Sequence, residues 1–340
     1  MNSCVLPRQK TVLIGKAASM SIPAKAHFCW IGTKLPWMYA FAVLSAADNS
    51  GLDEIILHHT DTLEEGEVKR TLLSDPRITL RKFDPTEELI GIARDADLPD
   101  LSLSDLYGKI ASPAAKSDLL RYALLFRYGG IYLDMDTVTV KPLLTLLKND
   151  PFIGSEIIVW PPHVRGSRSH LLKTKHKILS VVRTVCRCVP HGWKAFRKIE
   201  FLFPQGFNGA IMGASARHDW IRECMRAMVS LPAEIQVKPY SIGPHLLHET
   251  ITHSKVKVYP PKFFYPISTE ISQHLFRSYA AVDAEKILYA ETNIVHWYAS
   301  VRTKSIVGKI TPDYIRDQKK TQMYAAIVNQ AVPSLFAAIK

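Results

Sequence analysis

The chain has 340 residues, of which 47% are hydrophobic, and a formal net charge of +12. This composition is typical of a globular protein with one large or two ordinary domains, and it excludes a largely disordered chain. No apolar run approaches the ~20 residues needed to span a bilayer, and the N-terminus lacks the long apolar core of a signal peptide. We therefore expect a soluble protein that is not exported.

The number and spacing of the cysteines indicate whether the protein lies in an oxidising or a reducing compartment. There are five, an odd number scattered along the chain. Secreted proteins held together by disulfides use even numbers at regular spacings. The sequence therefore predicts a reducing, cytoplasmic environment.

Residues 22–60 alternate between two apolar patterns. AHFCWIG and DEIILHHTD are short runs that predict strands, and WMYAFAVLSAADN between them predicts a helix. Residues 62–110 predict helical and irregular connections. Strands that alternate with helices indicate an α/β fold with a mostly parallel sheet and helices on its faces.

A helix followed directly by a strand comes next. PAAKSDLLRYALLFRY predicts a helix of about four turns that ends at a Gly-Gly pair, and IYLDMD predicts the strand. Because side chains alternate along a strand, Tyr132, Asp134 and Asp136 are expected on the face opposite the apolar residues. Two carboxylates two residues apart on one face of a strand repel each other unless a positive group lies between them.

The helix before this strand carries a second pair of charges. Asp118 and Arg121 are three residues apart, so they share a face, and the short turn should bring that face near Asp134 and Asp136. Arginine can contact phosphate through several N–H donors, and aspartate accepts hydrogen bonds from hydroxyls. Paired carboxylates suit Mg²⁺ or Mn²⁺, which can neutralise a diphosphate. Hydroxyls and phosphates together describe a nucleotide-sugar.

The second half of the chain carries a basic segment and several shorter patterns. Residues 157–199 contain no acidic residue and ten basic ones. Such a segment attracts anionic lipid headgroups, nucleic acid or phosphorylated ligands, although a solvated basic surface is an equal alternative. Further along, GAIMGA predicts a strand, SIGPHLLHET a turn and helix start, and KVKVYPPKFFYPI a β-rich stretch. The tail TQMYAAIVNQAVPSLFAAIK predicts a terminal helix packed on the body.

Three separated motifs resemble one family. KSDLLRYALLFRYGGIYLDMDTVTVKPL resembles the signature of glycosyltransferases with a DXD sugar-binding region, of the family 32 type. IPAKAHFCWIG resembles the first strand of that family and of the related clostridial glucosylating toxins. ETNIVHWYASV resembles their closing motif, except that the toxins have a serine-x-tryptophan arrangement where this chain has His296. The resemblance implies a metal-dependent hexosyltransferase of the GT-A fold, with a mostly parallel Rossmann-like sheet and a more irregular acceptor half.

The resemblance also implies how the donor is bound. Trp30 would stack on the nucleotide base, although a core tryptophan is the alternative. Asp118 would bind sugar hydroxyls, Arg121 the sugar or diphosphate, and Tyr132 would line the donor pocket. Asn208, in FNGAIMGA, would lie near the sugar and acceptor.

The remaining roles concern a cation. By the resemblance, Asp134 would face ribose, sugar and metal-bound water, and Asp136 would bind Mn²⁺ or Mg²⁺ directly. His296 would complete the metal site, with a partly buried structural histidine as the equal alternative. Asp118, Arg121 and Asp134 are the residues expected to act in catalysis.

The resemblance further implies a division of the chain. Its parts would be an N-terminal extension at 1–21, a GT-A catalytic domain at 22–305 and a C-terminal helical tail at 306–340. Within the domain, a nucleotide-sugar-binding half at 22–150 would precede an acceptor half at 151–305 with the basic insertion 157–199.

The expected reaction moves a sugar from a nucleoside-diphosphate donor to an acceptor hydroxyl, with retention of configuration. A UDP-sugar is the favoured donor and GDP-mannose the alternative. The basic segment fits a glycan or glycolipid acceptor in polysaccharide assembly, with peripheral contact to an anionic membrane at the cytoplasmic face.

Three other functions remain open. An effector-type enzyme would glycosylate a protein. A basic module would bind nucleic acid or membrane, with Trp160, Trp193 and Phe196 as stacking residues; no nucleic-acid motif is present, so this partner is not expected. A phosphatase or nuclease would use the same aspartates for hydrolysis, but those strands lack the preceding SDLLRY helix.

Overall fold

The computed structural model describes residues 21–238, 240–299 and 303–337. The N-terminal extension expected at 1–21 therefore lies outside the described residues, apart from residue 21. None of the described helices is long and apolar enough to cross a bilayer.

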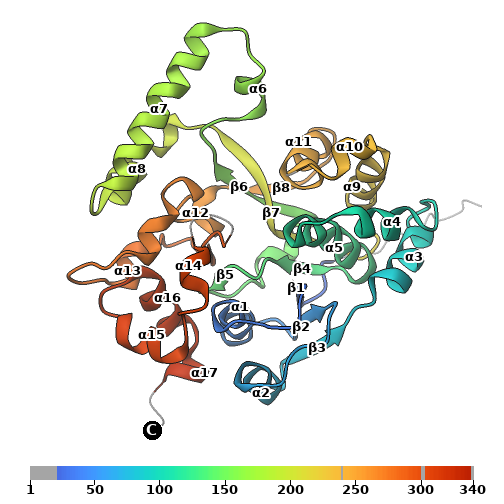
Figure 1. The fold of residues 1–340 in the computed structure, drawn as a ribbon, viewed down its shortest axis with the longest axis horizontal. Coiled ribbons are helices and arrows are strands. Elements are labelled where there is room, and N and C mark those ends of the chain that lie inside the picture. The colour runs from blue at the N-terminus through green and yellow to red at the C-terminus, as the bar shows by residue number, and fades with distance from the viewer. Residues whose placement is uncertain (1–20, 239, 300–302, 338–340) are drawn as a thin grey trace, which may run out of the picture.

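A seven-stranded sheet in the order β3-β2-β1-β4-β7-β6-β8 forms the centre of the molecule (Figure 1). Its strands are β1 (Lys25–Trp30), β2 (Glu54–His59), β3 (Ile78–Lys82), β4 (Gly130–Leu133), β6 (Phe152–Ile157), β7 (Gln205–Ala214) and β8 (Lys257–Tyr259). Strand β7 runs antiparallel to both of its neighbours, and all other neighbouring pairs are parallel. The predicted α/β class with a mostly parallel sheet is confirmed. Strands β5 (Thr137–Thr139) and β9 (Ile294–His296) form a separate antiparallel pair.

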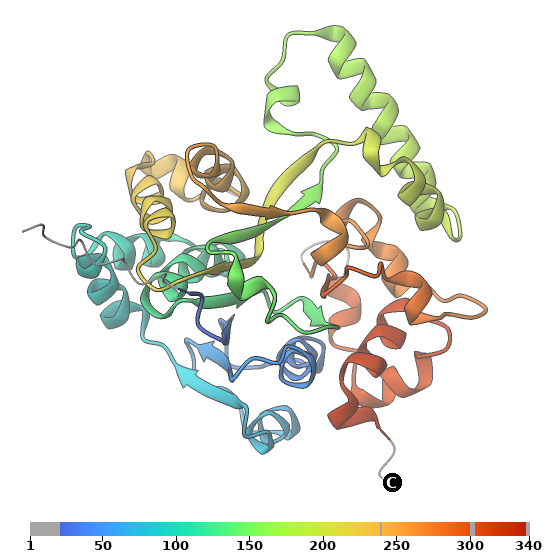
Figure 2. The ribbon, with the colours of Figure 1, turned by 180° about the vertical axis from the view of Figure 1, so that it is seen from behind.

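Helices cover both faces of this sheet, as the opposite views in Figures 1 and 2 show. In the first half they are α1 (Trp37–Asn49), α2 (Glu67–Ser74), α3 (Pro85–Asp95), α4 (Ser102–Lys109) and α5 (Pro113–Tyr128). In the second half they are α6 (Pro162–Arg165), α7 (His170–Cys188), α8 (Gly192–Ile199), α9 (Asp219–Ser230), α10 (Ala233–Gln236), α11 (Leu246–Ile251), α12 (Pro261–Phe264), α13 (Ala284–Ile287), α14 (Lys304–Val307), α15 (Pro312–Gln318), α16 (Met323–Ala331) and α17 (Pro333–Phe336). Short 3₁₀ helices lie at η1 (Leu146–Lys148), η2 (Glu200–Leu202) and η4 (Thr269–Phe276), and a π-helical segment lies at η3 (Ser241–His245).

Two apolar cores follow from this arrangement. One core packs α1 and the C-terminal helices against the sheet, and the other packs α3, α4, α5, α9 and α11 against it. Ile131, Leu133 and Met135 belong to the first core and Tyr132 to the second. The predicted alternation of side chains along β4 is therefore confirmed.

Two details differ from the sequence expectations. The stretch 62–110 contains a strand, β3, which is only five residues long and ends in two charged residues, so its pattern resembles a connection. KVKVYPPKFFYPI forms only the three-residue strand β8 before Pro261 begins the short helix α12. Proline lacks the N–H that a strand ladder needs and suits the first turn of a helix.

The turn from α5 into β4 depends on the predicted Gly-Gly pair. Gly129 and Gly130 have φ angles of +60° and +107°, in the region that side chains with a Cβ rarely adopt. A Cβ on Gly130 would also lie 2.7 Å from the carbonyl oxygen of Lys25. The pair thus lets α5 reverse directly into the central strand, which fixes the position of the aspartates that follow.

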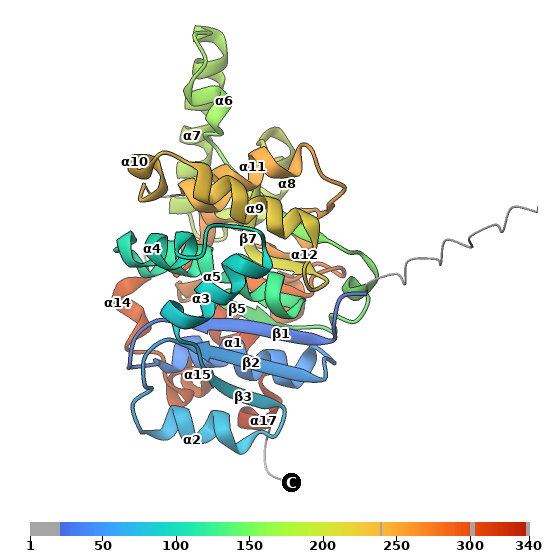
Figure 3. The same cartoon turned by 90° about the vertical axis from the view of Figure 1, so that its right-hand side faces the viewer.

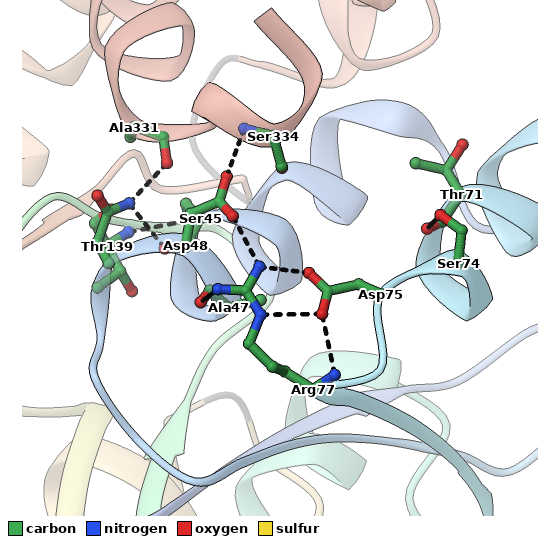
Figure 4. A network of polar contacts seen from close by, with 11 residues as sticks. Ser45, Ala47, Asp48, Thr71, Ser74, Asp75, Arg77, Thr139, Ala331 and Ser334 are labelled. Atoms are coloured by element: carbon green, nitrogen blue, oxygen red, sulfur yellow. Dashed lines mark hydrogen bonds and ion pairs between the residues drawn. The ribbon is translucent and has the colours of Figure 1, made fainter. Parts of the chain in front are cut away.

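The C-terminal helices are tied to α1 by a polar network (Figure 4). Asp48 accepts hydrogen bonds from the backbone N–H of Ser334 at 3.0 Å and from Arg77 at 2.9 Å. Asn49 donates to the carbonyl oxygens of Ala331, at 2.6 Å, and Thr139, at 3.0 Å. The predicted helical tail thus packs on the body, while the domain boundaries at 305 and 306 stay a prediction.

A buried histidine pair joins β1 to β2. His27 Nε2 must donate to the carbonyl oxygen of Gly129, 2.8 Å away, so His27 Nδ1 accepts from His58 Nε2 at 2.9 Å. Both rings are completely buried. Protonating either histidine would place an added charge inside the sheet and break this chain of bonds.

We expect the protein to lose stability in acid through this pair. Burial lowers the pKa of His27 from 6.5 to about 4, so the unfolded chain binds the proton first and stability falls as pH drops from 6.5 toward 4. The loss from this group is about 3 kcal/mol. Urea unfolding across this pH range should give a shallower pH slope for His27→Gln, and an unchanged slope for the exposed His253→Gln. Equal slopes in all three proteins would contradict the expectation.

Candidate active site

Asp134 and Asp136 lie directly after β4, at the end of the central strand. The backbone N–H of Asp134 donates to the carbonyl oxygen of Ala210 on β7 at 2.8 Å, which holds the chain at the sheet edge. Both aspartate side chains are largely buried. Ligands generally bind at this edge of an open α/β sheet.

Arg121 lies between two carboxylates. Its guanidinium is 2.8 Å from an oxygen of Asp118, and it donates to both oxygens of Asp134 at 2.9 and 3.1 Å. Only 4% of Arg121 is exposed. The face shared by Asp118 and Arg121, and its approach to the DMD aspartates, are as the sequence predicted.

Burial and charge act in opposite directions on this cluster. Burial raises the pKa of Asp118 to about 6, against the opposing charge of Arg121. Burial also raises the pKa of Asp134, with Arg121 again opposing it. For Arg121, burial would lower the pKa, but the charges of Asp134 and Asp118 outweigh it and raise that pKa well above its usual value. The arginine therefore stays charged and compensates the buried carboxylates.

Asp136 has its own positive partner. His296 lies on β9, opposite Thr137 of β5, and its Nε2 is 2.9 Å from an oxygen of Asp136. The other oxygen of Asp136 accepts from the backbone N–H of Ala299 at 2.7 Å. Burial would raise the pKa of Asp136, but these contacts outweigh it and lower that pKa. Asp136 likewise overcomes the effect of burial on His296, whose pKa is raised.

The two neighbouring aspartates are therefore balanced by two separate positive groups. Arg121 holds Asp134 from the side of α5, and His296 holds Asp136 from the side of β9. Sequence reasoning placed Arg121 there from helix spacing. His296 could be placed only through the resemblance, because 160 residues separate it from Asp136.

The same three residues, Asp134, Asp136 and His296, can hold a metal ion. Each offers one ligand atom, and these atoms lie within 4.8 Å of one another. Carboxylates suit Mg²⁺ and Mn²⁺, and the imidazole is compatible with Mn²⁺. The Nδ1 atom of His296 is buried without a hydrogen-bond partner, so one polar atom of this ring, next to the carboxylates, is left unpaired. The donor set therefore fits a divalent cation.

The other predicted residues surround this cluster at different distances. Tyr132 stacks beneath Arg121, with the guanidinium carbon 5.1 Å from the ring centroid, and its hydroxyl is 2.7 Å from that of Ser117. Asn208 accepts from the backbone N–H of Ala210 at 2.8 Å, and Ala210 in turn bonds Asp134. Asn208 is thus linked to Asp134 through the backbone of Ala210.

Tyr39 links Trp30 to the cluster. The ring of Trp30 is half-buried and lies 4.8 Å, centroid to centroid, from that of Tyr39. Burial raises the pKa of Tyr39 to about 12, and the charge of Asp136 adds to the rise, so Tyr39 lies within electrostatic reach of the site. The structure thus brings Trp30, at the end of β1, to the edge of the sheet at which β4 also ends.

Sequence reasoning missed a second polar group beside the site. Glu156 of β6 is buried, one of its oxygens has no hydrogen-bond partner, and burial raises its pKa. Tyr298 is also buried, has a left-handed φ of +60°, and its ring centroid is 4.2 Å from that of His296. Tyr265 donates to the carbonyl oxygen of Asn208 at 3.3 Å. An acidic residue inside the apolar run FIGSEI was the available signal for Glu156.

Two glycines of the other motifs make room for the charged cluster. A Cβ on Gly209, in FNGAIMGA, would lie 2.2 Å from a guanidinium nitrogen of Arg121. A Cβ on Gly243, in SIGPHLL, would lie 2.7 Å from an oxygen of Asp118. The absence of a side chain at Gly209 and Gly243 therefore leaves room for Arg121 and Asp118.

We expect Gly209→Ala to displace Arg121. The buried guanidinium must shift, which should cost about 1–3 kcal/mol of stability and weaken binding of a nucleoside diphosphate at least about tenfold. Gly108→Ala is the matched control, because nothing lies within 4 Å of its added Cβ. Urea unfolding and calorimetric titration measure the two effects, and an unchanged affinity in Gly209→Ala would contradict the expected displacement.

Comparison with known proteins supports the enzymatic class. Residues 77–153 match the family of glycosyltransferase sugar-binding regions containing a DXD motif. This region contains Asp118, Arg121, Tyr132 and both aspartates of the site. The chain therefore contains a glycosyltransferase sugar-binding region with a DXD motif. The finer assignment to family 32 stays a prediction.

The chain is similar to several solved glycosyltransferase structures. The apo form of mouse xyloside xylosyltransferase 1 has 15% identity and a TM-score of 0.44, over 82% of this chain and 99% of that one. The PaToxG glycosyltransferase has 14% identity and a TM-score of 0.41, over 68% and 69%. The ligand-free glycosyltransferase domain of the YGT toxin has 9% identity and a TM-score of 0.41, over 71% and 81%. The comparison with curated proteins found no match.

Proposed function

We propose that this glycosyltransferase moves a hexose from a nucleoside-diphosphate donor to an acceptor hydroxyl with the help of Mn²⁺ or Mg²⁺. The observation that carries the proposal is the presence of two groups of ion-paired side chains at the end of β4. Asp118, Arg121 and Asp134 form one group, and Asp136 and His296 form the other. Together they offer a fixed guanidinium and a cation site within one buried cluster.

Each residue then has a distinct task. Asp134, Asp136 and His296 hold the cation, which when bound supplies positive charge for the diphosphate. Arg121 is held rigidly by its two carboxylates, so it can stabilise developing negative charge without reorganising. Asp118 binds sugar hydroxyls, and Tyr132 packs beneath Arg121 and keeps it in place.

The donor and the stereochemistry are the finer parts of the proposal. A half-buried indole such as Trp30 stacks on uracil and guanine alike, so a UDP-sugar is the first donor to test and GDP-mannose the second. Asn208 would contact the sugar or acceptor. The reaction would proceed with retention of configuration at the anomeric carbon.

The acceptor we propose is a glycan or glycolipid of polysaccharide assembly at the cytoplasmic face of a membrane. Support comes from the basic segment 157–199, which would concentrate anionic acceptors near the enzyme. Incubation with a labelled UDP-sugar, followed by separation of lipid and protein fractions, tests this. Label in the lipid fraction supports the proposal, whereas label in protein favours an effector-type enzyme that modifies a protein.

A thermal-shift screen of UDP-, GDP- and CDP-sugars, with and without Mn²⁺, tests the donor and the cation together. A ligand that binds only the native state at about 100 times its Kd stabilises that state by about 2.7 kcal/mol and so raises its melting temperature. We expect one nucleotide to give a shift that EDTA abolishes. Equal shifts with and without the cation would reject the metal-dependent part of the proposal.

A further inference from the structure

The basic segment forms an arm that projects from the body. It contains α6, α7 and α8. Helix α6 and the N-terminal part of α7 stand apart from the sheet in Figures 1 and 3, whereas α8 and the C-terminal end of α7 pack on the body. The turn from α7 into α8 is tight, because a Cβ on Gly192 would lie 1.9 Å from the carbonyl oxygen of Cys186. The arm is therefore a compact helical hairpin.

One face of α7 is fixed to the rest of the protein. His176 Nδ1 bonds the carbonyl oxygen of Val159 at 2.7 Å, and Ser180 accepts from the indole N–H of Trp160 at 2.8 Å. Nearer the C-terminus of α7, Arg183 forms a 2.7 Å ion pair with Glu270 of η4. These contacts set the rotation of α7 about its own axis, so the opposite face is held toward solvent.

That opposite face carries four exposed apolar side chains. Leu171, Ile178, Val181 and Val185 are 83%, 59%, 63% and 55% exposed. At 3.6 residues per turn they lie within an arc of about 80° on the helix surface. An exposed apolar stripe of this kind marks an interaction surface, because water solvates it poorly.

Positive charge flanks the stripe on both sides. By the same helical period, Lys175 lies beyond one edge of the arc and Lys173 and Lys177 lie beyond the other. Among the described residues, none of these three lysines forms an ion pair, and residues 157–199 contain no acidic side chain. The long lysine stems can keep their charges in water beside a buried apolar stripe.

We propose that the exposed face of α7 docks on the surface of an anionic lipid bilayer, with Leu171, Ile178, Val181 and Val185 in the interface and the lysines on the headgroups. An apolar stripe between basic edges is the arrangement of helices that lie in the plane of a membrane surface. Nucleic acid matches the lysines and leaves the apolar stripe in water. A second copy of the arm would bring two strongly positive surfaces together.

The test is flotation of the full chain with vesicles of phosphatidylcholine alone or with about 30% phosphatidylserine. We expect binding to the anionic vesicles only, weakened when salt rises from about 0.1 to about 0.5 M. Ile178→Asn with Val181→Asn should weaken binding at least about tenfold, because both side chains leave the interface. Lys173→Gln, Lys175→Gln and Lys177→Gln together should weaken it by a similar factor.

Matched controls change residues elsewhere on the surface. Leu73→Asn with Leu101→Asn alters two side chains that are 56% and 55% exposed, and Lys255→Gln, Lys309→Gln and Lys320→Gln together remove three exposed charges. Both controls should bind vesicles like the unaltered chain. Circular dichroism and thermal melting should show that all variants remain folded.

Three outcomes would overturn the proposal. Vesicle binding that survives the Ile178 and Val181 substitutions would reject the stripe as the contact. Binding of single-stranded nucleic acid instead of vesicles, lost only with the lysines, would assign the arm to that partner. A dimer in sedimentation velocity that the asparagine substitutions dissociate would assign the stripe to a second copy. Donor binding without vesicles tests the proposed transfer reaction separately, and the arm variants should leave it unchanged.

Discussion

The Asp136→Asn variant is expected to lose the cation-dependent part of donor binding and to transfer sugar about 10²- to 10³-fold more slowly. Asparagine has nearly the same shape and can still accept the hydrogen bond from Ala299, but it lacks the negative charge that a divalent cation requires. His296 also loses its charged partner, so its pKa should fall. Thermal shift with the donor, with and without Mn²⁺, separates loss of the cation from loss of the donor.

Asp313→Asn serves as the control for this substitution. Asp313 is on the surface, with 88% of its side chain exposed, in an ion pair with Arg316. It should bind cation and donor like the unaltered chain. If Asp136→Asn retained a Mn²⁺-dependent shift of normal size, the assignment of Asp136 as a metal ligand would be wrong.

Arg121→Ala should produce the largest loss of stability, about 3–5 kcal/mol. The substitution leaves Asp118 and Asp134 buried beside each other without their shared positive partner. The loss should be greatest at neutral pH and smaller in mild acid. Burial already raises the pKa of Asp118 to about 6, and removing Arg121 would raise it further, so protonation of this carboxyl relieves the repulsion as pH falls. Urea unfolding at several pH values measures this dependence.

Two further variants show whether the charge of Arg121 or the shape of its guanidinium is what matters. Arg121→Lys keeps the positive charge but cannot reach both carboxylates with a planar fork, so we expect partial stability and strongly reduced transfer. Arg94→Ala, which breaks an exposed pair with Asp100, should cost less than about 1 kcal/mol. An Arg121→Ala protein as stable as Arg94→Ala would show that the buried charges are compensated by another group.

Local patterns in the sequence were enough to predict the central unit of the site. The spacing of Asp118 and Arg121, the Gly-Gly stop and the alternation around Asp134 depend on residues within a short stretch of chain. Helix and strand periodicity act over this distance, and the short turn between α5 and β4 leaves little freedom in how the two elements meet. The 2.9 Å contact between Arg121 and Asp134 follows from that local geometry.

The tertiary structure decided what completes the site and what faces solvent. His296, Glu156 and Tyr298 reach the cluster only because β9 and β6 lie beside it, and no local pattern specifies pairing over 160 residues, as between His296 and Asp136. The arm is a similar case. Its sequence determined its charge and its helical period, whereas the contacts of His176, Ser180 and Arg183 determined which side of α7 remains exposed. Composition and periodicity are properties of a segment, but burial and long-range pairing are properties of the whole fold.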